Sequence, residues 1–225
     1  MRPTPKFPYL EHNGILAFAH RGGNLRASEN TMASFSDAAR QGYRFLETDV
    51  HASRDGVVFA FHDDNLLRMT GEDIAINGLD AADIDSITVA GGHAIPRMED
   101  LLEAFPECRF NIDAKAWPVV EPLGQLIRRT EVDDRICIGA FNDERIFKVR
   151  QLVGRSLCHS IGVRESARFR LAARLGLNAY FTAGCVQFPV NRKGVSMVTP
   201  ASVAHAHKLG LQVHAWTIND ESTMH

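Results

Sequence analysis

The chain alternates strand-like and helix-like segments along its 225 residues, and this alternation constrains its fold more than any other feature. It runs without a low-complexity linker or a break in composition, which favours one α/β domain spanning residues 1–225. Strands are expected at residues 15–20, 44–50, 109–115, 135–141, 156–161, 178–183 and 211–218. Helices are expected near residues 31–41, 97–104, 119–129, 143–152, 165–175 and 200–209. Asn30 or Ser28 is the candidate cap of the first helix.

One stretch, at about residues 64–96, does not fit the alternation. It consists of short helical pieces separated by Gly71, Gly78, Gly91 and Gly92, so we expect an excursion from the main fold. Just before it, the Asp55-Gly56 pair between apolar runs predicts a tight turn into a further short strand that ends at His62.

Polar residues cluster at the C-terminal ends of the predicted strands. They are His20, Arg21, Glu47, Asp49, Asp113, Lys115, Asn142, Trp216 and Asn219. Strands that alternate with helices pair in parallel, so these ends meet at one face, which is where the active site of a (β/α)₈ barrel lies. A doubly wound sheet would also bind ligands there, but no glycine-rich dinucleotide fingerprint follows the first strand in the required form. The sequence therefore favours a TIM barrel.

The polar residues in these strand ends suit a metal and a phosphate. Glu47 and Asp49 are two positions apart in a strand and share a face, so a hard cation between them would offset their repulsion. Asp113 and Lys115 repeat this pattern on another strand, which adds a third carboxylate and a point charge. Arg21 supplies a planar fork for two phosphate oxygens. The simpler alternative for Glu47 and Asp49 is a half-buried strand with one wet face.

Composition limits the partners of such a site. The formal net charge is −2 and the pI is about 6.5, without basic runs, which argues against binding nucleic acid. We therefore expect a small-molecule substrate. No stretch is apolar and long enough for a signal peptide or a membrane span, so a cytoplasmic protein without stable membrane insertion is expected. The four cysteines show neither disulfide nor zinc spacing, which favours buried free thiols.

The motifs occur in an order that resembles one family closely. The segments are AHRGG, SENTMASFSDAARQG, LETDVHASRDGVVFAFHDDNLLRMTG, FNIDAK and VHAWTIND, between Ile15 and Asp220. Together they resemble the glycerophosphodiester phosphodiesterases, and the most specific part runs from His20 to Gly71. The resemblance implies a TIM barrel with an inserted subdomain after the His62-Asp63 pair, which fits the irregular stretch at residues 64–96.

The resemblance also implies roles for individual residues. Glu47, Asp49 and Asp113 would coordinate one divalent cation, magnesium or calcium, with manganese as a further candidate. Asp113 stands where the family usually has glutamate. His20 and His62 would be the acid and base, in an unassigned order, and Arg21 and Lys115 would bind phosphate. The implied reaction is hydrolysis of glycerophosphodiesters to an alcohol and glycerol 3-phosphate, as part of lipid and glycerol metabolism.

Other residues near these motifs have less specific roles. Trp216 is expected to project inward near the mouth of the site and to pack on the glycerol or head group, with core packing as the alternative. Glu29 and Asn30 are expected to brace the first loop, or to cap its helix, as supporting residues. His51 either reaches the site or lines its rim. One apolar string forms either a lip for an acyl chain or simple core, and it consists of Tyr180, Phe181, Val186, Phe188 and Val190.

The C-terminal residues raise a question about completeness. Residues 219–222 start like a helix, yet Thr223, Met224 and His225 are all that follow, whereas a complete barrel needs another helix and strand. The sequence thus predicts a domain truncated at its C-terminus that lacks its last strand and helix. Three functions stay open: a glycerophosphodiester phosphodiesterase, a lysophospholipase D-like lipid phosphodiesterase, and a non-catalytic truncated remnant.

Overall fold

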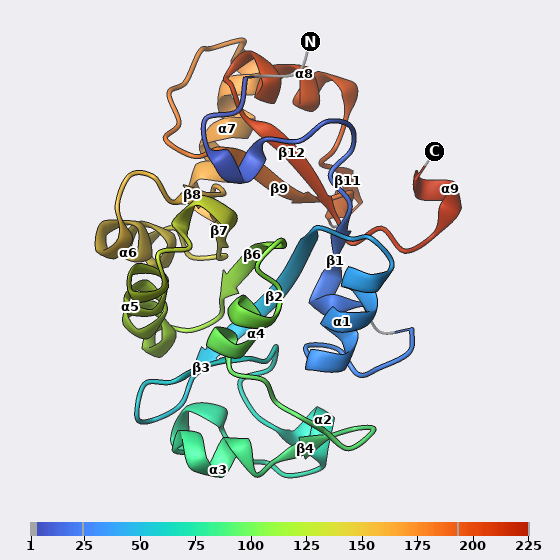
Figure 1. Cartoon of the computed structure of the whole chain (residues 1–225). Coiled ribbons are helices and arrows are strands. Elements are labelled where there is room, and N and C mark those ends of the chain that lie inside the picture. Colours follow the sequence, from blue (N-terminus) through green and yellow to red (C-terminus); the bar gives the residue numbers. More distant parts are fainter. Residues whose placement is uncertain (1–3, 24, 193, 225) are drawn as a thin grey trace.

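A parallel β-sheet forms the centre of the protein in a computed structural model that describes residues 4–23, 25–192 and 194–224 (Figure 1). Parallel strands lie side by side in the order β1 (Phe18–Ala19), β2 (Phe45–Ala52), β6 (Arg109–Ala114), β7 (Ile136–Gly139) and β8 (Cys158–His159). A second parallel pair consists of β9 (Cys185–Pro189) and β12 (Gln212–Trp216). A bridge between Ser160 and Cys185 joins the two sets. The expected α/β class with parallel strands is confirmed.

Helices alternate with these strands and lie outside the sheet (Figure 1). They are α1 (Met32–Arg40), α4 (Met98–Ala104), α5 (Val120–Thr130), α6 (Asp143–Val153), α7 (Val163–Leu175) and α8 (Pro200–Lys208). Each begins and ends within two residues of its predicted bounds. The cap of α1, however, was predicted wrongly. Thr31 caps the helix by accepting from the Ser34 backbone N–H, whereas the Asn30 side chain accepts from Thr48 Oγ1 at 2.9 Å and Ser28 donates to the Ala90 carbonyl.

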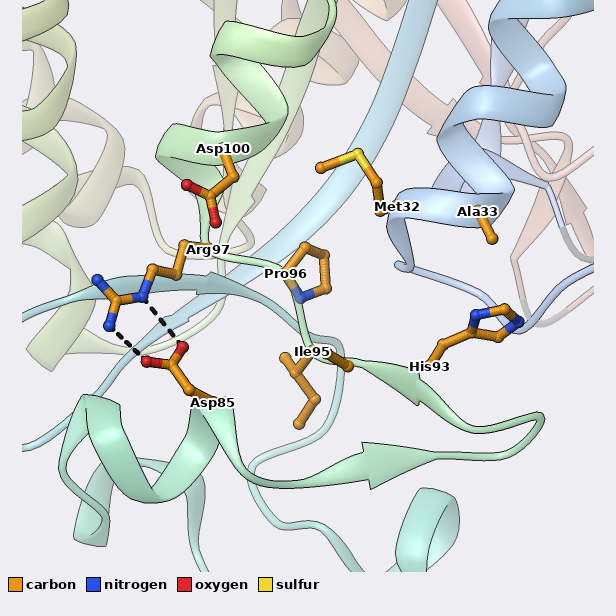
Figure 2. A pocket seen from close by; sticks show the side chains of 9 residues that line it. Met32, Ala33, Asp85, His93, Ile95, Pro96, Arg97 and Asp100 are labelled. Atoms are coloured by element: carbon orange, nitrogen blue, oxygen red, sulfur yellow. Dashed lines mark hydrogen bonds and ion pairs between the residues drawn. The ribbon is translucent and has the colours of Figure 1, made fainter.

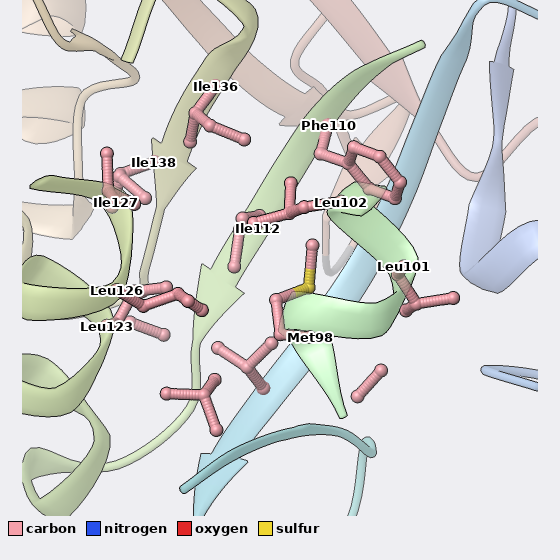
Figure 3. Packing of buried hydrophobic residues seen from close by; sticks show 14 of the residues in the cluster. Met98, Leu101, Leu102, Phe110, Ile112, Leu123, Leu126, Ile127, Ile136 and Ile138 are labelled. Carbon is pink, nitrogen blue, oxygen red and sulfur yellow. The ribbon is translucent and has the colours of Figure 1, made fainter. Parts of the chain in front are cut away.

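The largest apolar core lies between the sheet and helices α4 and α5 (Figure 3). Its labelled side chains come from one face of each helix and from the outward faces of β6 and β7, and they are Met98, Leu101, Leu102, Phe110, Ile112, Leu123, Leu126, Ile127, Ile136 and Ile138. Burying one such aliphatic side chain contributes roughly 1.5–3 kcal/mol. This core fixes β6 against the helices and so fixes where its C-terminal end points.

The prediction of a strand at residues 178–183 is wrong. The strand at this place is β9 (Cys185–Pro189), whereas Phe181 and Ala183 are buried in a separate apolar cluster with residues of α7 and α8. The backbone carbonyls of Phe181 and Ala183 accept hydrogen bonds from Lys6 Nζ at 3.3 and 3.4 Å. The apolar alternation of this stretch thus reflects packing against helices. Phe181, Val186 and Phe188 belong to this core, which settles their alternative readings in favour of core.

Residues 64–96 form short elements that lie beyond the ends of β2 and β3 (Val58–Ala60) (Figure 1). They comprise α2 (Leu67–Thr70), η3 (Ile76–Gly78), α3 (Ala81–Asp85), β4 (Thr88–Val89) and β5 (His93–Ala94). This segment has its own apolar cluster, which includes Phe59, Phe61, Leu66 and Ile76. The predicted turn at Asp55-Gly56 is confirmed, because β2 and β3 pair antiparallel on either side of it.

A cavity of about 240 Å³ lies where this segment meets α1 and α4 (Figure 2). Arg97 pairs with Asp85 across it through two hydrogen bonds, from Nε at 3.0 Å and from Nη2 at 2.5 Å. None of the predicted site residues lines this cavity.

The remaining elements are short. They are η1 (Pro8–Leu10), η2 (His20–Gly22), η4 (Trp117–Val119), η5 (Asp133–Arg135), β10 (Asn191–Arg192), β11 (Val195–Ser196) and α9 (Glu221–Met224). Tyr9 and Leu10 of η1 are buried in one cluster with Cys137, Cys158 and Cys185 at the N-terminal ends of the strands. All four cysteines are buried and free, as predicted. In the described part of the chain, the helices are too short or too polar to cross a membrane.

Candidate active site

The three predicted carboxylates lie on neighbouring strands. Glu47 and Asp49 share one face of β2, and Asp113 lies on β6. The parallel pairing of these strands sets Asp49 directly opposite Asp113 and Glu47 opposite Asn111. The Asn111 side chain is held by a hydrogen bond from Gln187 Nε2 at 2.8 Å, which ties β6 to β9. The strand register therefore brings the acidic groups together.

Two positively charged side chains, Lys115 and Arg21, lie among these carboxylates. Lys115 Nζ is 3.2 Å from Asp49 Oδ1 and 3.6 Å from Asp113 Oδ2. Arg21 approaches from the opposite side, with Nε 3.1 Å from Asp49 Oδ2. Its backbone N–H also donates to Glu47 Oε2 at 3.0 Å. One carboxylate, Asp49, is thus held between both predicted phosphate-binding side chains.

A tight turn after β1 aims Arg21 in this direction. Arg21 has φ of 53° and Gly22 has φ of 74°, both in the left-handed region. A Cβ on Gly22 would lie 2.5 Å from Ser34 Oγ and 2.9 Å from the Phe35 backbone nitrogen. Only glycine therefore fits at residue 22, and the close approach of the turn to α1 depends on it.

The two predicted histidines flank the acidic cluster. His20 Nε2 lies 3.8 Å from Glu47 Oε2, and burial together with the charge of Arg21 lowers the pKa of His20. His62 follows β3, and its Nδ1 lies 2.5 Å from Asp63 Oδ1. His62 comes directly after Phe61, whose backbone N–H donates to the Asp49 carbonyl oxygen at 2.9 Å, so His62 lies beside the carboxyl end of β2. Each imidazole has a carboxylate neighbour on one side and is partly exposed on the other.

Burial and mutual repulsion both disfavour the ionised forms of Glu47 and Asp113. Burial and the nearby charge of Asp49 raise the pKa of Glu47 to about 8. Burial also raises the pKa of Asp113, against the opposing effect of Lys115. Asp113 Oδ1 is buried and accepts no hydrogen bond from any residue that the structure describes. These are hard oxygen donors of the kind that magnesium and calcium prefer.

Asp49 faces Arg21 with one carboxylate oxygen and Lys115 with the other, so its oxygens are already paired with cationic side chains. Among residues 4–23, 25–192 and 194–224, no three histidine, cysteine or carboxylate groups already form a ligand set. The donor chemistry, the raised pKa values and the unpaired oxygen fit a divalent cation nevertheless.

Supporting residues extend the site beyond those that the strand ends predicted. Glu29 Oε1 accepts from Arg21 Nη1 at 3.0 Å and from Arg68 Nη2 at 2.6 Å. Arg68 Nε also donates to Asp63 Oδ2 at 2.5 Å. Arg68 had no predicted role, although it lies at the end of the segment LETDVHASRDGVVFAFHDDNLLRMTG that carries the family resemblance. Asn30 is buried on Thr48, behind the cluster.

Aromatic side chains lie at the rim. Trp216, at the end of β12, is 40% exposed and packs edge-to-face on Phe141 with ring centroids 6.3 Å apart. It is therefore outside the buried core, against the alternative of core packing. His51 is buried with Nε2 3.3 Å from the His62 carbonyl oxygen, so it contacts the backbone of the His62 loop.

The chain is similar to known phosphodiesterases over most of its length. The family model of the glycerophosphoryl diester phosphodiesterase family matches residues 20–225. A Mycobacterium tuberculosis protein named probable glycerophosphodiester phosphodiesterase 2 is 38% identical over 228 residues, covering 99% of this chain and 86% of its own. A lysophospholipase D of Homo sapiens is 31% identical over 249 residues, covering 90% of this chain and 76% of its own.

A solved structure shows the same fold. An Oleispira antarctica phosphodiesterase in complex with its product sn-glycerol-3-phosphate superposes with a TM-score of 0.73 at 22% identity, covering 91% of this chain and 85% of its own. Together with the matched family model and the M. tuberculosis relative, this shows that the chain belongs to the glycerophosphoryl diester phosphodiesterase family and is a phosphoric diester hydrolase.

Proposed function

We propose that the protein hydrolyses glycerophosphodiesters to an alcohol and glycerol 3-phosphate with one divalent cation and two histidines. The observation that carries this proposal is the register of β2 and β6, which places Asp49 opposite Asp113 with Arg21 and Lys115 on either side. Carboxylates for a cation and cations for a phosphate therefore meet at one point, with His20 and His62 beside them.

Glu47, Asp49 and Asp113 are the residues that would hold the cation, magnesium or calcium, with manganese as a further candidate. The raised pKa values of Glu47 and Asp113 and the unpaired Asp113 oxygen support this choice. The cation would supply positive charge that offsets the repulsion of the carboxylates and stabilises charge on the phosphoryl oxygens.

Arg21 and Lys115 are proposed to bind the phosphate. Both pair with Asp49, at 3.1 and 3.2 Å. A diester phosphate would accept from the planar guanidinium through two oxygens and from the ammonium through one. Because Glu29 holds Arg21 Nη1, the fork keeps one orientation while the phosphate enters.

The environments of the histidines suggest different tasks. Burial and Arg21 lower the pKa of His20, so its ring is neutral near pH 7 and can accept the proton of the attacking hydroxyl or water. Asp63 Oδ1, 2.5 Å from Nδ1 of His62, orients that ring, so that its Nε2 can pass a proton to the leaving alcohol. Arg21 and Lys115 meanwhile stabilise the charge that develops on the phosphoryl oxygens.

We also propose that the parallel strands form a TIM-type barrel around this site. The order β1-β2-β6-β7-β8, the bridge to β9 and the pairing of β9 with β12 support a curved sheet. The Phe18 and His214 rings lie 4.9 Å apart, which brings β1 and β12 near each other.

A lysophospholipase D-like activity is the second candidate, because Trp216 and the 53% exposed Phe141 form an apolar pair at the rim. Such a pair can contact an acyl chain. The likeness to the human lysophospholipase D supports the same reading.

Hydrolysis assays test these proposals. Chelator-treated protein is titrated with magnesium, calcium or manganese against glycerophosphocholine, glycerophosphoethanolamine and a lysophospholipid. We expect metal-dependent release of glycerol 3-phosphate, and a loss of about 10²–10⁴-fold in His20→Ala. Glu47→Ala is expected to lose metal dependence together with activity, whereas His12→Ala, on an exposed histidine, serves as the control.

The outcomes separate the candidates. Faster hydrolysis of the lysophospholipid than of both water-soluble diesters favours the second candidate. No hydrolysis with any metal and any substrate supports a non-catalytic remnant. Undiminished turnover by His20→Ala or Glu47→Ala refutes the assignment of the site.

A further inference from the structure

Arg68 lies outside the sheet and links two sets of contacts in the site, which we call its arms: the histidine arm, from Asp63 to His62, and the arginine arm, from Glu29 to Arg21. It lies in α2, the short helix of the segment at residues 64–96, and its side chain is 48% exposed. Its guanidinium donates from Nε to Asp63 Oδ2 at 2.5 Å and from Nη2 to Glu29 Oε1 at 2.6 Å. Asp63 follows β3 and Glu29 lies in the loop before α1, so one side chain ties two separate loops together.

The first arm leads to a histidine. Asp63 uses Oδ1 for His62 Nδ1, at 2.5 Å, and Oδ2 for Arg68, so both of its oxygens are engaged. A carboxylate held at both oxygens cannot rotate away from the imidazole. The ring is thereby fixed with Nδ1 toward Asp63, which leaves Nε2 as the nitrogen that exchanges protons.

The second arm leads to the phosphate-binding arginine. Glu29 Oε1 accepts from Arg68 and also from Arg21 Nη1, at 3.0 Å. Arg21 in turn lies 3.1 Å from Asp49 through Nε. The contacts therefore run without a break from His62 through Asp63, Arg68, Glu29 and Arg21 to Asp49.

We propose that Arg68 is a positioning residue that orients His62 and Arg21 at the same time, by holding Asp63 and Glu29 with one guanidinium. This inference rests on the function proposed above. An isolated ion pair at a half-exposed position contributes little, but a planar fork whose Nε and Nη2 engage two different carboxylates fixes their relative positions. Lysine, a point charge on a flexible stem, cannot impose the same geometry.

The charges of the two acids agree with this role. Partial burial would raise the pKa of Glu29 and of Asp63, yet the hydrogen bonds from Arg68 hold both pKa values below their ordinary range. Both carboxylates therefore stay ionised across the range in which histidine titrates, and each can hold its partner in the site.

Steady-state kinetics of single variants test the inference, with the glycerophosphodiester that the wild type hydrolyses fastest. Asp63→Asn acts directly on the contact with His62 and is expected to lower kcat by about tenfold or more with little change in KM. Glu29→Gln acts directly on the contact with Arg21 and is expected mainly to raise KM. Arg68→Gln is expected to lower kcat and raise KM together.

Further variants separate positioning from folding. Arg68→Lys is expected to recover only part of the loss, because it cannot hold both acids. The double variant Arg68→Gln with Asp63→Asn is expected to have nearly the kcat of Asp63→Asn alone, since both changes break one arm. Arg97→Gln is the matched control: Arg97 also makes two hydrogen bonds to a carboxylate in this part of the fold and is 40% exposed.

The inference is overturned if Arg68→Gln keeps kcat and KM within twofold of Arg97→Gln. It is also overturned if the fold-loss in kcat of the double variant equals the product of the losses of Arg68→Gln and Asp63→Asn, or if Arg68→Lys has the full activity of the wild type. Thermal melting of each variant identifies a general loss of folding, and a variant that melts like the wild type yet shows the split in kcat and KM supports the inference. If the wild type hydrolyses no substrate, the proposed function is refuted, and this inference with it. If the wild type is active, the kinetics of the Arg68 variants test this inference alone.

Discussion

Replacing Glu47 by glutamine should stabilise the metal-free protein in a pH-dependent way. Burial and Asp49 raise the pKa of Glu47 from its ordinary value of 4.5 to about 8. A raised pKa in the folded state means that the protonated carboxyl contributes stability below pH 4.5, and that this contribution is lost as the pH rises through 8. At about 1.4 kcal/mol for each pH unit, the full loss is about 5 kcal/mol.

Glutamine cannot ionise, so Glu47→Gln avoids this loss. It keeps an oxygen for the Arg21 backbone N–H, which Glu47 Oε2 accepts at 3.0 Å. Relative to the wild type, the free energy of unfolding of the variant should therefore rise by about 4 kcal/mol between pH 5 and pH 9.

Urea unfolding in the presence of a chelator measures this difference at both pH values. Glu103→Gln, on an exposed glutamate of α4, is the control and should show no such trend. Excess magnesium or calcium at pH 9 should then stabilise the wild type more than Glu47→Gln, because binding to the folded state raises the free energy of unfolding. A difference between wild type and variant that stays constant from pH 5 to pH 9 would refute the reasoning, and so would equal stabilisation of both by the cation.

Two further predictions concern the loop after β1. If His20 is the base, its lowered pKa places the acid limb of the pH profile of kcat/KM below pH 6.5, and a limb at or above 6.5 would contradict that role. Gly22→Ala should lower the free energy of unfolding by about 1–3 kcal/mol more than Gly23→Ala in urea titrations, because only the first added methyl group meets Ser34 and Phe35, although both residues have positive φ. Equal losses would show that the contact with α1 yields without cost.

The sequence predicted those parts of the fold in which local pattern and tertiary packing agree. The six predicted helices have apolar stripes, and α1, α6 and α8 also begin at a capping side chain, so their bounds came within two residues. The strand at residues 178–183 failed for a tertiary reason. Its alternation is genuine, but Phe181 and Ala183 pack against helices and their carbonyls bind Lys6, about 175 residues earlier in the chain.

In the site, too, local pattern predicted some features and tertiary packing determined others. The meeting of Glu47, Asp49, Asp113, Lys115 and Arg21 follows from where parallel strands end, so the pattern of each strand was sufficient to predict it. The bridge through Arg68 was not predicted. It depends on how α2, a four-residue helix without periodicity, lies against two loops, and no local pattern determines that placement.

The segment before β1 has a consequence for how the chain acquires its structure during synthesis. Lys6 donates to the carbonyls of Phe181, Ala183 and Leu209, and the Leu10 carbonyl accepts from Gln212. These partners lie 175 to 203 residues further along the chain, so residues 6–10 cannot dock until that length has been synthesised. Closing so long a loop costs entropy, which the contacts of residues 6–10 offset only once the loop has closed. Their docking is therefore a late event, and the cluster that contains Cys137, Cys158 and Cys185 stays exposed until then.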